Sequence, residues 1–258
     1  MDTKDLFLER ARAIAQDDRS GATDLTLRAA DLVLDAMAAG QGRAVAEALL
    51  RAKPMMASLL NLACLALDAD LDAVRSFRDR LESAVVEAAR RVAAFMRERS
   101  SPRTVLTLSA SRVVEAAIRL STREGLVSRV IVAESRPRLE GAGMAQRLAQ
   151  DGCEVAITHD AALPGLCGPE DLVLVGADAV LPDAFVNKAG TFALFLAARE
   201  VAAERVVVTT SHKVLLPEAV RFFRVAEEVR VPGSPAFLDV QFERTPIALA
   251  SALVTENG

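Results

Sequence analysis

The sequence contains no tryptophan and no tyrosine, and aromatic residues make up only 4% of its 258 residues. Proteins that bind single-stranded nucleic acid stack the bases on aromatic side chains, and this chain has few side chains of that kind. Its formal net charge is −4 and its isoelectric point is about 5.4, whereas a nucleic-acid-binding face is basic. The sequence therefore argues against nucleic acid as a partner.

Cysteine and histidine are also scarce. The three cysteines, Cys64, Cys153 and Cys167, form no CxxC pair, and such sparse cysteines are typical of a reducing cytosol without a disulfide framework. The two histidines, His159 and His212, are too few for a histidine-based metal site. We therefore predict a cytoplasmic protein without a metal centre.

Long apolar runs are missing as well. The richest stretch, residues 55–67, is about 13 residues long, whereas a helix needs about 20 apolar residues to cross a bilayer. The first residues, MDTKDLFLERARAIAQDD, are charged throughout and lack the apolar segment of a signal peptide. We expect no membrane partner. Hydrophobic residues still make up 52% of the chain, which is enough for a substantial core.

The pattern of apolar residues changes near residue 100. Before it, apolar residues recur with helical spacing, and we predict helices over residues 3–16, 24–38, 42–50, 55–68 and 70–98. After it, strand-like runs alternate with helical runs, which is typical of a parallel, doubly wound sheet. We predict strands over 104–109, 129–133, 154–158, 172–175, 206–210 and 228–231, and helices over 113–124, 141–151, 191–204 and 217–221. The predicted fold class is α/β, with a helical N-terminal domain (1–100) and a Rossmann-like C-terminal domain (101–258).

The most informative segment is VLVGADAVLPDAFVNKAGT, residues 173–191. Asp178 follows a strand pattern, and ligands of open α/β sheets bind at the carboxyl ends of the strands. Asp178 is therefore a candidate general acid or base, although an aspartate can also simply cap a turn there. Asn187 and Lys188 precede a helix pattern that begins near Thr191. Alone they would be solvated loop residues, but together with Asp178 they suit a small phosphorylated ligand that also uses a helix N-terminus.

Other polar side chains follow other strands. Ser109 and Ser111 can donate to an anion or cap the next helix. Arg136 can grip a phosphate through its planar guanidinium, and Glu140 precedes a glycine at a helix start, where it is a capping residue or a ligand contact. For His212 and the lysine after it, a buried histidine and a solvated lysine are the simpler interpretation. No GxGxxG follows the first strand, so a dinucleotide-binding enzyme is not favoured.

Taken together, these motifs resemble one family: the regulatory alpha, beta and delta subunits of eukaryotic initiation factor 2B and the related isomerases of methylthioribose 1-phosphate and ribose 1,5-bisphosphate. The resemblance covers residues 103–258 in the family's order. Two N-terminal elements match more loosely, with Lys53 where an arginine is usual. The matching segments are VLTLSASRVV (105–114), ESRP (134–137) with Glu140-Gly141, GAD (176–178), NKAGT (187–191), TTSHK (209–213), FERTP (242–246), TENG (255–258), DRSGA (18–22) and RAKP (51–54).

The resemblance implies a phosphorylated sugar bound in a cleft between the two domains, a homodimer formed through the C-terminal domain, and no organic cofactor. It also implies substrate-binding roles for Arg19, Gly21, Ala22, Lys53, Arg136, Glu140, Asn187 and Lys188. In the isomerases, an aspartate and a cysteine convert an aldose 1-phosphate to a ketose 1-phosphate, and the matching positions here are Asp178 and Ser109.

The serine at position 109 leaves two functions open. A serine hydroxyl is a far weaker acid than a cysteine thiol, whose pKa is about 8.5, and this difference weighs against isomerase activity. One function is therefore a sugar-phosphate-binding protein with isomerase chemistry at Asp178 and with Ser109 as a hydrogen-bond donor. The other is a non-catalytic protein, similar to the regulatory subunits, that acts through a protein partner with the sugar phosphate as effector.

Overall fold

The computed structural model describes residues 3–17, 20–99, 103–225 and 240–258, and they form two compact units. The helical unit consists of residues 1–84, 178–181 and 210–224, and the sheet unit consists of residues 85–177, 182–209 and 225–258. Arg19 and the predicted strand over 228–231 lie outside the described residues. Each unit is considered separately below.

The helical unit is built around α4, which contacts α2 and α3. Nine of the eleven residues of α4 are buried, as expected of a helix that is apolar on every side. All the helices predicted for this part of the chain are confirmed, each to within two residues at either end. They are α1 (Thr3–Gln16), α2 (Ala22–Ala38), α3 (Gly42–Ala52), α4 (Ala57–Leu67) and α5 (Leu71–Arg97), the last of which continues into the sheet unit.

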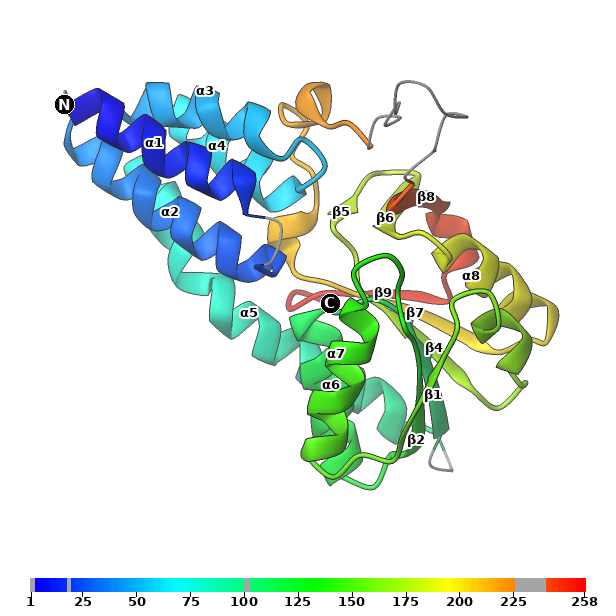
Figure 1. The fold of residues 1–258 in the computed structure, drawn as a ribbon. Helices are drawn as coiled ribbons and strands as arrows, with labels where there is room; N and C mark the ends of the chain where they lie inside the picture. The colour runs from blue at the N-terminus through cyan, green and yellow to red at the C-terminus, as the bar shows by residue number, and fades with distance from the viewer. Residues whose placement is uncertain (1–2, 18–19, 100–102, 226–239) are drawn as a thin grey trace, which may run out of the picture. The chain divides into compact units, whose positions relative to one another are not determined.

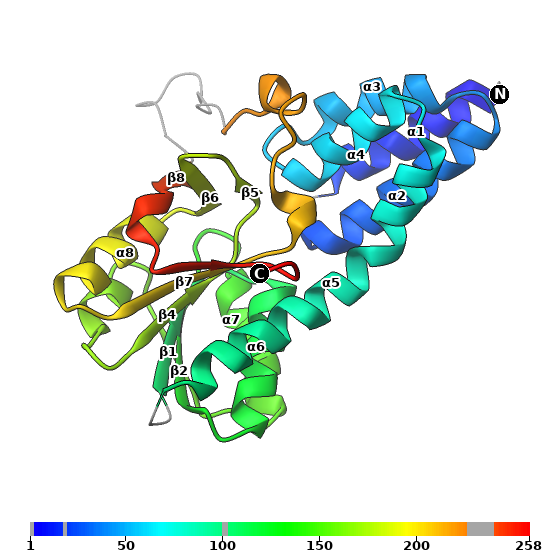
Figure 2. The same ribbon diagram turned by 180° about the vertical axis from the view of Figure 1, so that it is seen from behind.

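The sheet unit contains a six-stranded sheet in the order β3-β2-β1-β4-β7-β9. Every recorded pairing in it is parallel, which confirms the predicted fold class. The helices α6 and α7 cover one face and α8 covers the other (Figures 1 and 2). The strands are β1 (Arg103–Thr107), β2 (Val127–Ala133), β3 (Val155–Thr158), β4 (Leu172–Val175), β7 (Glu204–Val208) and β9 (Ala252–Val254); the helices are α6 (Arg112–Arg123), α7 (Glu140–Gln150) and α8 (Thr191–Glu200).

The direction of the chain through this sheet reverses between β1 and β4. From β1 the chain moves outward through β2 to β3, and from β4 it moves the other way through β7 to β9. Such a switch point leaves a crevice at the carboxyl ends of the two central strands, where ligands of this architecture bind. The segments that begin at Leu108 and Gly176 therefore lie at this crevice.

Besides β9, three other short strands were not predicted. They are β5 (Ala179–Val180), β6 (Ala184–Lys188) and β8 (Phe242–Pro246), and β6 pairs with β8 in antiparallel register, with Asn187 opposite Glu243. The polar residues at the end of β6 make it look like a loop, and its partner strand lies more than 50 residues further along the chain. Local sequence carries no signal for a pairing of that kind.

Two predicted helices differ from the structure. The prediction ended α8 at Glu204, but α8 ends at Glu200 because Ala202 has a φ of 59°, which turns the chain into β7. The predicted helix over 217–221 is a turn followed by a 3-10 helix over Val220–Phe222. The remaining 3-10 helices are Leu163–Leu166, Ser211–Lys213 and Ile247–Leu249.

Candidate functional site

The turn between β1 and α6 lies against the end of β4. A Cβ atom at Gly176 would come within 2.8 Å of the Ser111 Oγ and 3.0 Å of the Ser111 Cβ, so this close approach requires glycine. Ser111 precedes α6 in extended conformation and makes no side-chain capping hydrogen bond. The sequence suggested that Ser111 either caps α6 or donates to an anion, and the structure does not support the capping role.

The segment after β2 is fixed by a carboxylate from the segment after β3. Asp160 accepts hydrogen bonds from the backbone N–H groups of Ser135 and Arg136, both at 2.7 Å. Ser135 is buried, and its Oγ accepts the Ser109 N–H at 2.7 Å. These bonds join the ends of β1 and β2. The role of Asp160 was not predicted, because it lies in a different strand-end segment from the residues that it holds.

The Arg136 side chain is 67% exposed and pairs with Glu134 through Nε at 3.2 Å. His159 contacts the same carboxylate oxygen at 3.2 Å. Hydrogen bonds from His159 and Arg136 hold the pKa of Glu134 below its usual range. Arg136 can bind a phosphate only if its guanidinium contacts Glu134 and the phosphate together, or if its ion pair with Glu134 breaks. Arg138 is exposed.

Lys188 is the most deeply buried cation of the candidate site. It lies in β6 with 3% of its side chain exposed, and its Nζ is 2.9 Å from the Glu140 Oε1. The same oxygen lies 3.4 Å from the Ser109 Oγ, which donates to it. The structure thus brings together three of the predicted residues: Ser109 after β1, Glu140 at the start of α7 and Lys188 in β6. These three residues are called the Lys188 cluster below. Lys188 is not the solvated loop residue that its local sequence allowed.

Asn187 is held by the residue that begins α8. Its Nδ2 donates to the Thr191 Oγ1 at 3.0 Å, and the Thr191 Oγ1 donates to the Lys188 carbonyl at 2.7 Å. Both Asn187 and Thr191 are buried. The amide of Asn187 is therefore fixed in one orientation beside Lys188.

The N-terminus of α8 does not present free N–H groups at Gly190 and Phe192. Both donate to the Glu243 Oε1 in β8, at 2.9 and 2.8 Å. The sequence suggested that a phosphate would use this helix end, but a carboxylate of the same chain occupies it. The glutamate of the FERTP segment is therefore a structural cap, which occupies the N–H groups of Gly190 and Phe192.

In the helical unit, Asp178 lies next to a second lysine. The Asp178 Oδ1 is 3.6 Å from the Lys213 Nζ, with 24% and 14% of the two side chains exposed. Lys213 is thus not the solvated residue that the sequence favoured. The Asp178 carbonyl accepts the Ala57 N–H at 3.2 Å, which joins it to the start of α4. His212 is buried against Phe77, as the sequence indicated.

Asn61 of α4 holds the segment that carries Lys213. Its Nδ2 donates to the carbonyls of His212 and Val214 at 2.9 and 2.8 Å, and its Oδ1 accepts the Leu216 N–H at 3.0 Å. Only 2% of Asn61 is exposed. An asparagine inside the apolar run of residues 55–67 is a signal that could have drawn attention to it, because a buried amide needs partners.

The remaining predicted residues of the helical unit lie at helix ends. Gly21 precedes α2 and its carbonyl accepts the Leu25 N–H at 3.0 Å, and Ala22 is the first residue of α2. Lys53 follows α3 and is half-buried. No recorded contact joins these three to Asp178 within the described residues, so their binding roles stay predictions.

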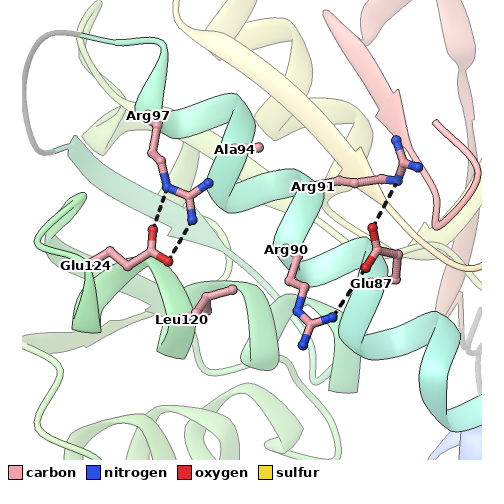
Figure 3. Close-up of a pocket in the computed structure, with 7 residues that line it drawn as sticks. All are labelled: Glu87, Arg90, Arg91, Ala94, Arg97, Leu120 and Glu124. Atoms are coloured by element: carbon pink, nitrogen blue, oxygen red, sulfur yellow. Dashed lines mark hydrogen bonds and ion pairs between the residues drawn. The ribbon is translucent and has the colours of Figure 1, made fainter.

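A hollow of about 480 Å³ on the sheet unit lies between α5 and α6 and contains three arginines (Figure 3). Arg97 donates two hydrogen bonds to Glu124, at 2.9 and 2.7 Å, and Arg90 and Arg91 share Glu87 at 3.5 and 3.8 Å. Each guanidinium already has a carboxylate partner. The three guanidinium groups of the hollow are thus paired with carboxylates, as the Lys188 ammonium is.

The described residues contain no group of three or more histidine, cysteine, aspartate and glutamate side chains that could hold a metal ion. No helix among them is both long enough and apolar enough to cross a membrane. The predictions that the protein uses no metal and no organic cofactor remain predictions.

Cys167 is the least buried of the three cysteines. Even so, its partial burial raises the pKa of its thiol to about 11, and the nearby Asp171 makes a smaller contribution. Because the thiolate is the reactive form, native Cys167 should react with iodoacetamide at pH 8 on the order of 100 times more slowly than a thiol of pKa about 8.5. The rate should rise about tenfold per pH unit up to pH 11. Peptide mass spectrometry measures the rate, and equal rates in native and urea-unfolded protein would contradict the expectation.

The residues Ser109, Glu140 and Lys188 lie at the switch point of a parallel α/β sheet. The chain matches the model of the Initiation factor 2 subunit family over residues 19–258. It therefore belongs to that family. A translation initiation factor eIF-2B subunit 2-like protein of Pyrococcus horikoshii is 30% identical to it over 221 residues, which are 82% of this chain and 78% of that protein. The crystal structure of a Pyrococcus horikoshii eIF-2B superposes with a TM-score of 0.81 at 27% identity, covering 98% of this chain and 96% of the other.

Isomerases of the same family match a smaller part of the chain. The ribose 1,5-bisphosphate isomerase of Haloferax volcanii is 30% identical over 201 residues, which are 73% of this chain and 61% of that enzyme. The methylthioribose-1-phosphate isomerase of Trichormus variabilis is 31% identical over 157 residues, which are 55% of this chain and 45% of that enzyme. This chain thus spans 61% of the length of the first isomerase and 45% of the length of the second.

Proposed function

We propose that this protein binds a phosphorylated sugar through the Lys188 cluster of the sheet unit. The observation that carries the proposal is the nearly complete burial of the Lys188 ammonium beside Glu140 at the carboxyl end of β1. A lysine is expensive to bury, so a buried one at a switch point is a candidate ligand contact. The names of the isomerase relatives supply the class of ligand, a ribose phosphate or a thio analogue of it.

In this proposal Lys188 and Arg136 neutralise phosphate charge, and the fixed amide of Asn187 orients a sugar hydroxyl. The motifs of the helical unit assign further contacts to Arg19, Gly21, Ala22 and Lys53. Phosphate oxygens prefer charged side chains to the N-terminus of α8, since Glu243 already occupies the N–H groups there.

The chemistry that we propose is the conversion of an aldose 1-phosphate to a ketose 1-phosphate. A hydrogen moves from C2 to C1, the C2 hydroxyl loses a proton, and the ring oxygen released by ring opening gains one. Asp178 takes the proton from the C2 hydroxyl, and the Lys213 ammonium lies 3.6 Å from its carboxylate. A serine hydroxyl is too weak an acid to replace a thiol fully. The Ser109 hydroxyl donates to Glu140 and can accept a hydrogen bond from a sugar hydroxyl.

A second function, regulation without catalysis, is favoured by two observations. Position 109 is a serine, and the subunit-like relative aligns over 82% of this chain whereas the methylthioribose-1-phosphate isomerase aligns over 55%. In that case the sugar phosphate would bind as an effector and the protein would act through a protein partner, with a homodimer formed by the sheet unit. Product formation distinguishes the two functions.

The test is turnover followed by NMR with ribose 1,5-bisphosphate and methylthioribose 1-phosphate. We expect a ketose product with the native protein, and Asp178→Asn should lower the rate at least about 100-fold, because general acid–base groups contribute that much. Asp72→Asn is the matched control, since Asp72 is 96% exposed and should leave the rate unchanged. Binding of both sugars without product would exclude catalysis on them and favour regulation. Absence of binding to either would exclude the sugar-phosphate proposal.

A further inference from the structure

The carboxylate of Glu140 contacts both other members of the Lys188 cluster, Lys188 and Ser109. The only ion pair recorded for Lys188 within the described residues is the one with Glu140, at 2.9 Å. A buried ammonium needs such a partner, because it has lost the water that would otherwise stabilise its charge. The position of Lys188 therefore depends on Glu140.

Glu140 is itself fixed by the backbone. It is the first residue of α7, where a negative charge is favoured by the helix dipole. The next residue, Gly141, lies so close to the end of β2 that a Cβ there would be 2.0 Å from the Ala133 carbonyl oxygen. The start of α7 thus lies directly against the end of β2, where the Ala142 N–H also donates to the Glu134 carbonyl at 3.3 Å. The carboxylate is presented from a rigid support, as a residue that orients others must be.

Two groups share one oxygen of this carboxylate. The Glu140 Oε1 accepts from both the Lys188 ammonium and the Ser109 hydroxyl, while its Oε2 is buried and has no hydrogen-bond partner in the described residues. Glu140 is also a poor contact for a phosphate, because a carboxylate repels one. Glu140 therefore has the contacts of a residue that orients the site, although the sequence placed it among the substrate-binding residues.

We propose that Glu140 is a positioning residue, which holds the Lys188 ammonium and the Ser109 hydroxyl in place for the sugar phosphate without binding the phosphate itself. The inference rests on the proposed function. It makes a prediction opposite to that of simple charge attraction. Removing a negative charge near an anion site should strengthen anion binding by Coulomb's law, whereas removing a positioning residue should weaken it.

The binding test uses ribose 1,5-bisphosphate and isothermal titration calorimetry. We expect Glu140→Gln to raise the Kd about tenfold, or about 1.4 kcal/mol, despite the lost negative charge. Glu140→Asp keeps the charge but shortens the reach, and it should raise the Kd as well. The matched control is Glu170→Gln, at an exposed position of the same unit, which should leave the Kd unchanged. An unchanged or lower Kd in Glu140→Gln would overturn the proposal.

A double-mutant cycle separates positioning from a general loss of fold. If Glu140 acts through Lys188, the variant with both Glu140→Gln and Lys188→Gln should bind no more weakly than Lys188→Gln alone. Additive losses would mean that Glu140 acts independently of Lys188 and would overturn the proposal. Circular dichroism of each variant shows whether it remains folded, and Glu140→Asp carries the test if Glu140→Gln unfolds.

A measurement without ligand keeps this inference distinct from the proposed function. In ¹⁵N-labelled native protein, a buried and hydrogen-bonded lysine ammonium exchanges slowly with water, so Lys188 should give an ammonium signal that Lys188→Gln assigns by its absence. We expect Glu140→Gln to lose or broaden this signal and Glu170→Gln to retain it. An unaltered signal in Glu140→Gln would overturn the positioning role. Failure of the native protein to bind either sugar, with this signal behaving as expected, would instead refute the proposed function.

Discussion

Gly141→Ala is expected to destabilise the protein by about 2–3 kcal/mol, which is at the upper end of the usual cost of overpacking. The added Cβ would lie 2.0 Å from the Ala133 carbonyl oxygen and 2.6 Å from the Ser135 Oγ. The carbonyl belongs to β2, which is paired with strands on both sides, so it cannot move aside without disturbing the sheet. Chemical denaturation followed by circular dichroism measures the change in the free energy of unfolding.

The same helix provides a control with the opposite expected sign. Gly143 also lies in α7, but a Cβ there would meet only the Arg147 guanidinium, at an ordinary contact distance of 3.6 Å. Since alanine is favoured over glycine in a helix by about 1 kcal/mol, Gly143→Ala should stabilise the protein by roughly 0.5–1 kcal/mol. Equal effects of the two substitutions would show that helix propensity, and not contact with β2, governs this helix.

The strain in Gly141→Ala should also reach the candidate site, because Glu140 is the preceding residue. If α7 moves away from β2 to relieve the contact, the Glu140 carboxylate moves with it. We therefore expect weaker binding of ribose 1,5-bisphosphate in Gly141→Ala than in Gly143→Ala. The difference follows from geometry alone, since neither substitution changes the charge of the site.

The sequence predicted the framework of the site well, because the framework depends on local patterns. The apolar run over Leu172–Val175 followed by GAD is sufficient to place Asp178 after a strand, and the helical spacing before residue 100 is sufficient to predict α1 to α5. Local patterns of this kind determine where an element begins and ends. The candidate residues at strand ends were chosen for the same reason, since the alternation of strands and helices predicts a parallel sheet whose strand ends share one edge.

The partners of those residues could not be predicted, since each partner is distant in sequence. Glu140 and Lys188 are 48 positions apart, and Asp178 and Lys213 are 35 apart. The local sequence around Lys188 indicates a solvated loop, and its burial appears only when β6 pairs with β8. The same holds for Glu243, which became a helix cap through that pairing. Tertiary pairing overrides local propensity at such positions.

Asn61→Ala is the second substitution with a large expected effect, of about 3 kcal/mol on the free energy of unfolding. It removes the side-chain partner of three backbone groups, the buried carbonyl of His212 and the part-buried carbonyl of Val214 and N–H of Leu216. Each such group costs about 1–3 kcal/mol when it is unsatisfied, although the three costs do not simply add. The direct measurement is amide hydrogen exchange, in which the Leu216 N–H should lose most of its protection.

Asn61→Ala also separates stability from chemistry at Asp178. Lys213 lies within the segment that Asn61 holds, so its release should remove the ammonium from beside the Asp178 carboxylate. If Asp178 transfers a proton, turnover should then fall more than the loss of folded protein explains, and Lys213→Gln should reproduce that fall without the change in stability. Asn257→Ala, at an exposed position, should alter neither quantity. Normal turnover in folded Asn61→Ala would mean that the segment after β7 contributes to the stability of the helical unit but not to its chemistry.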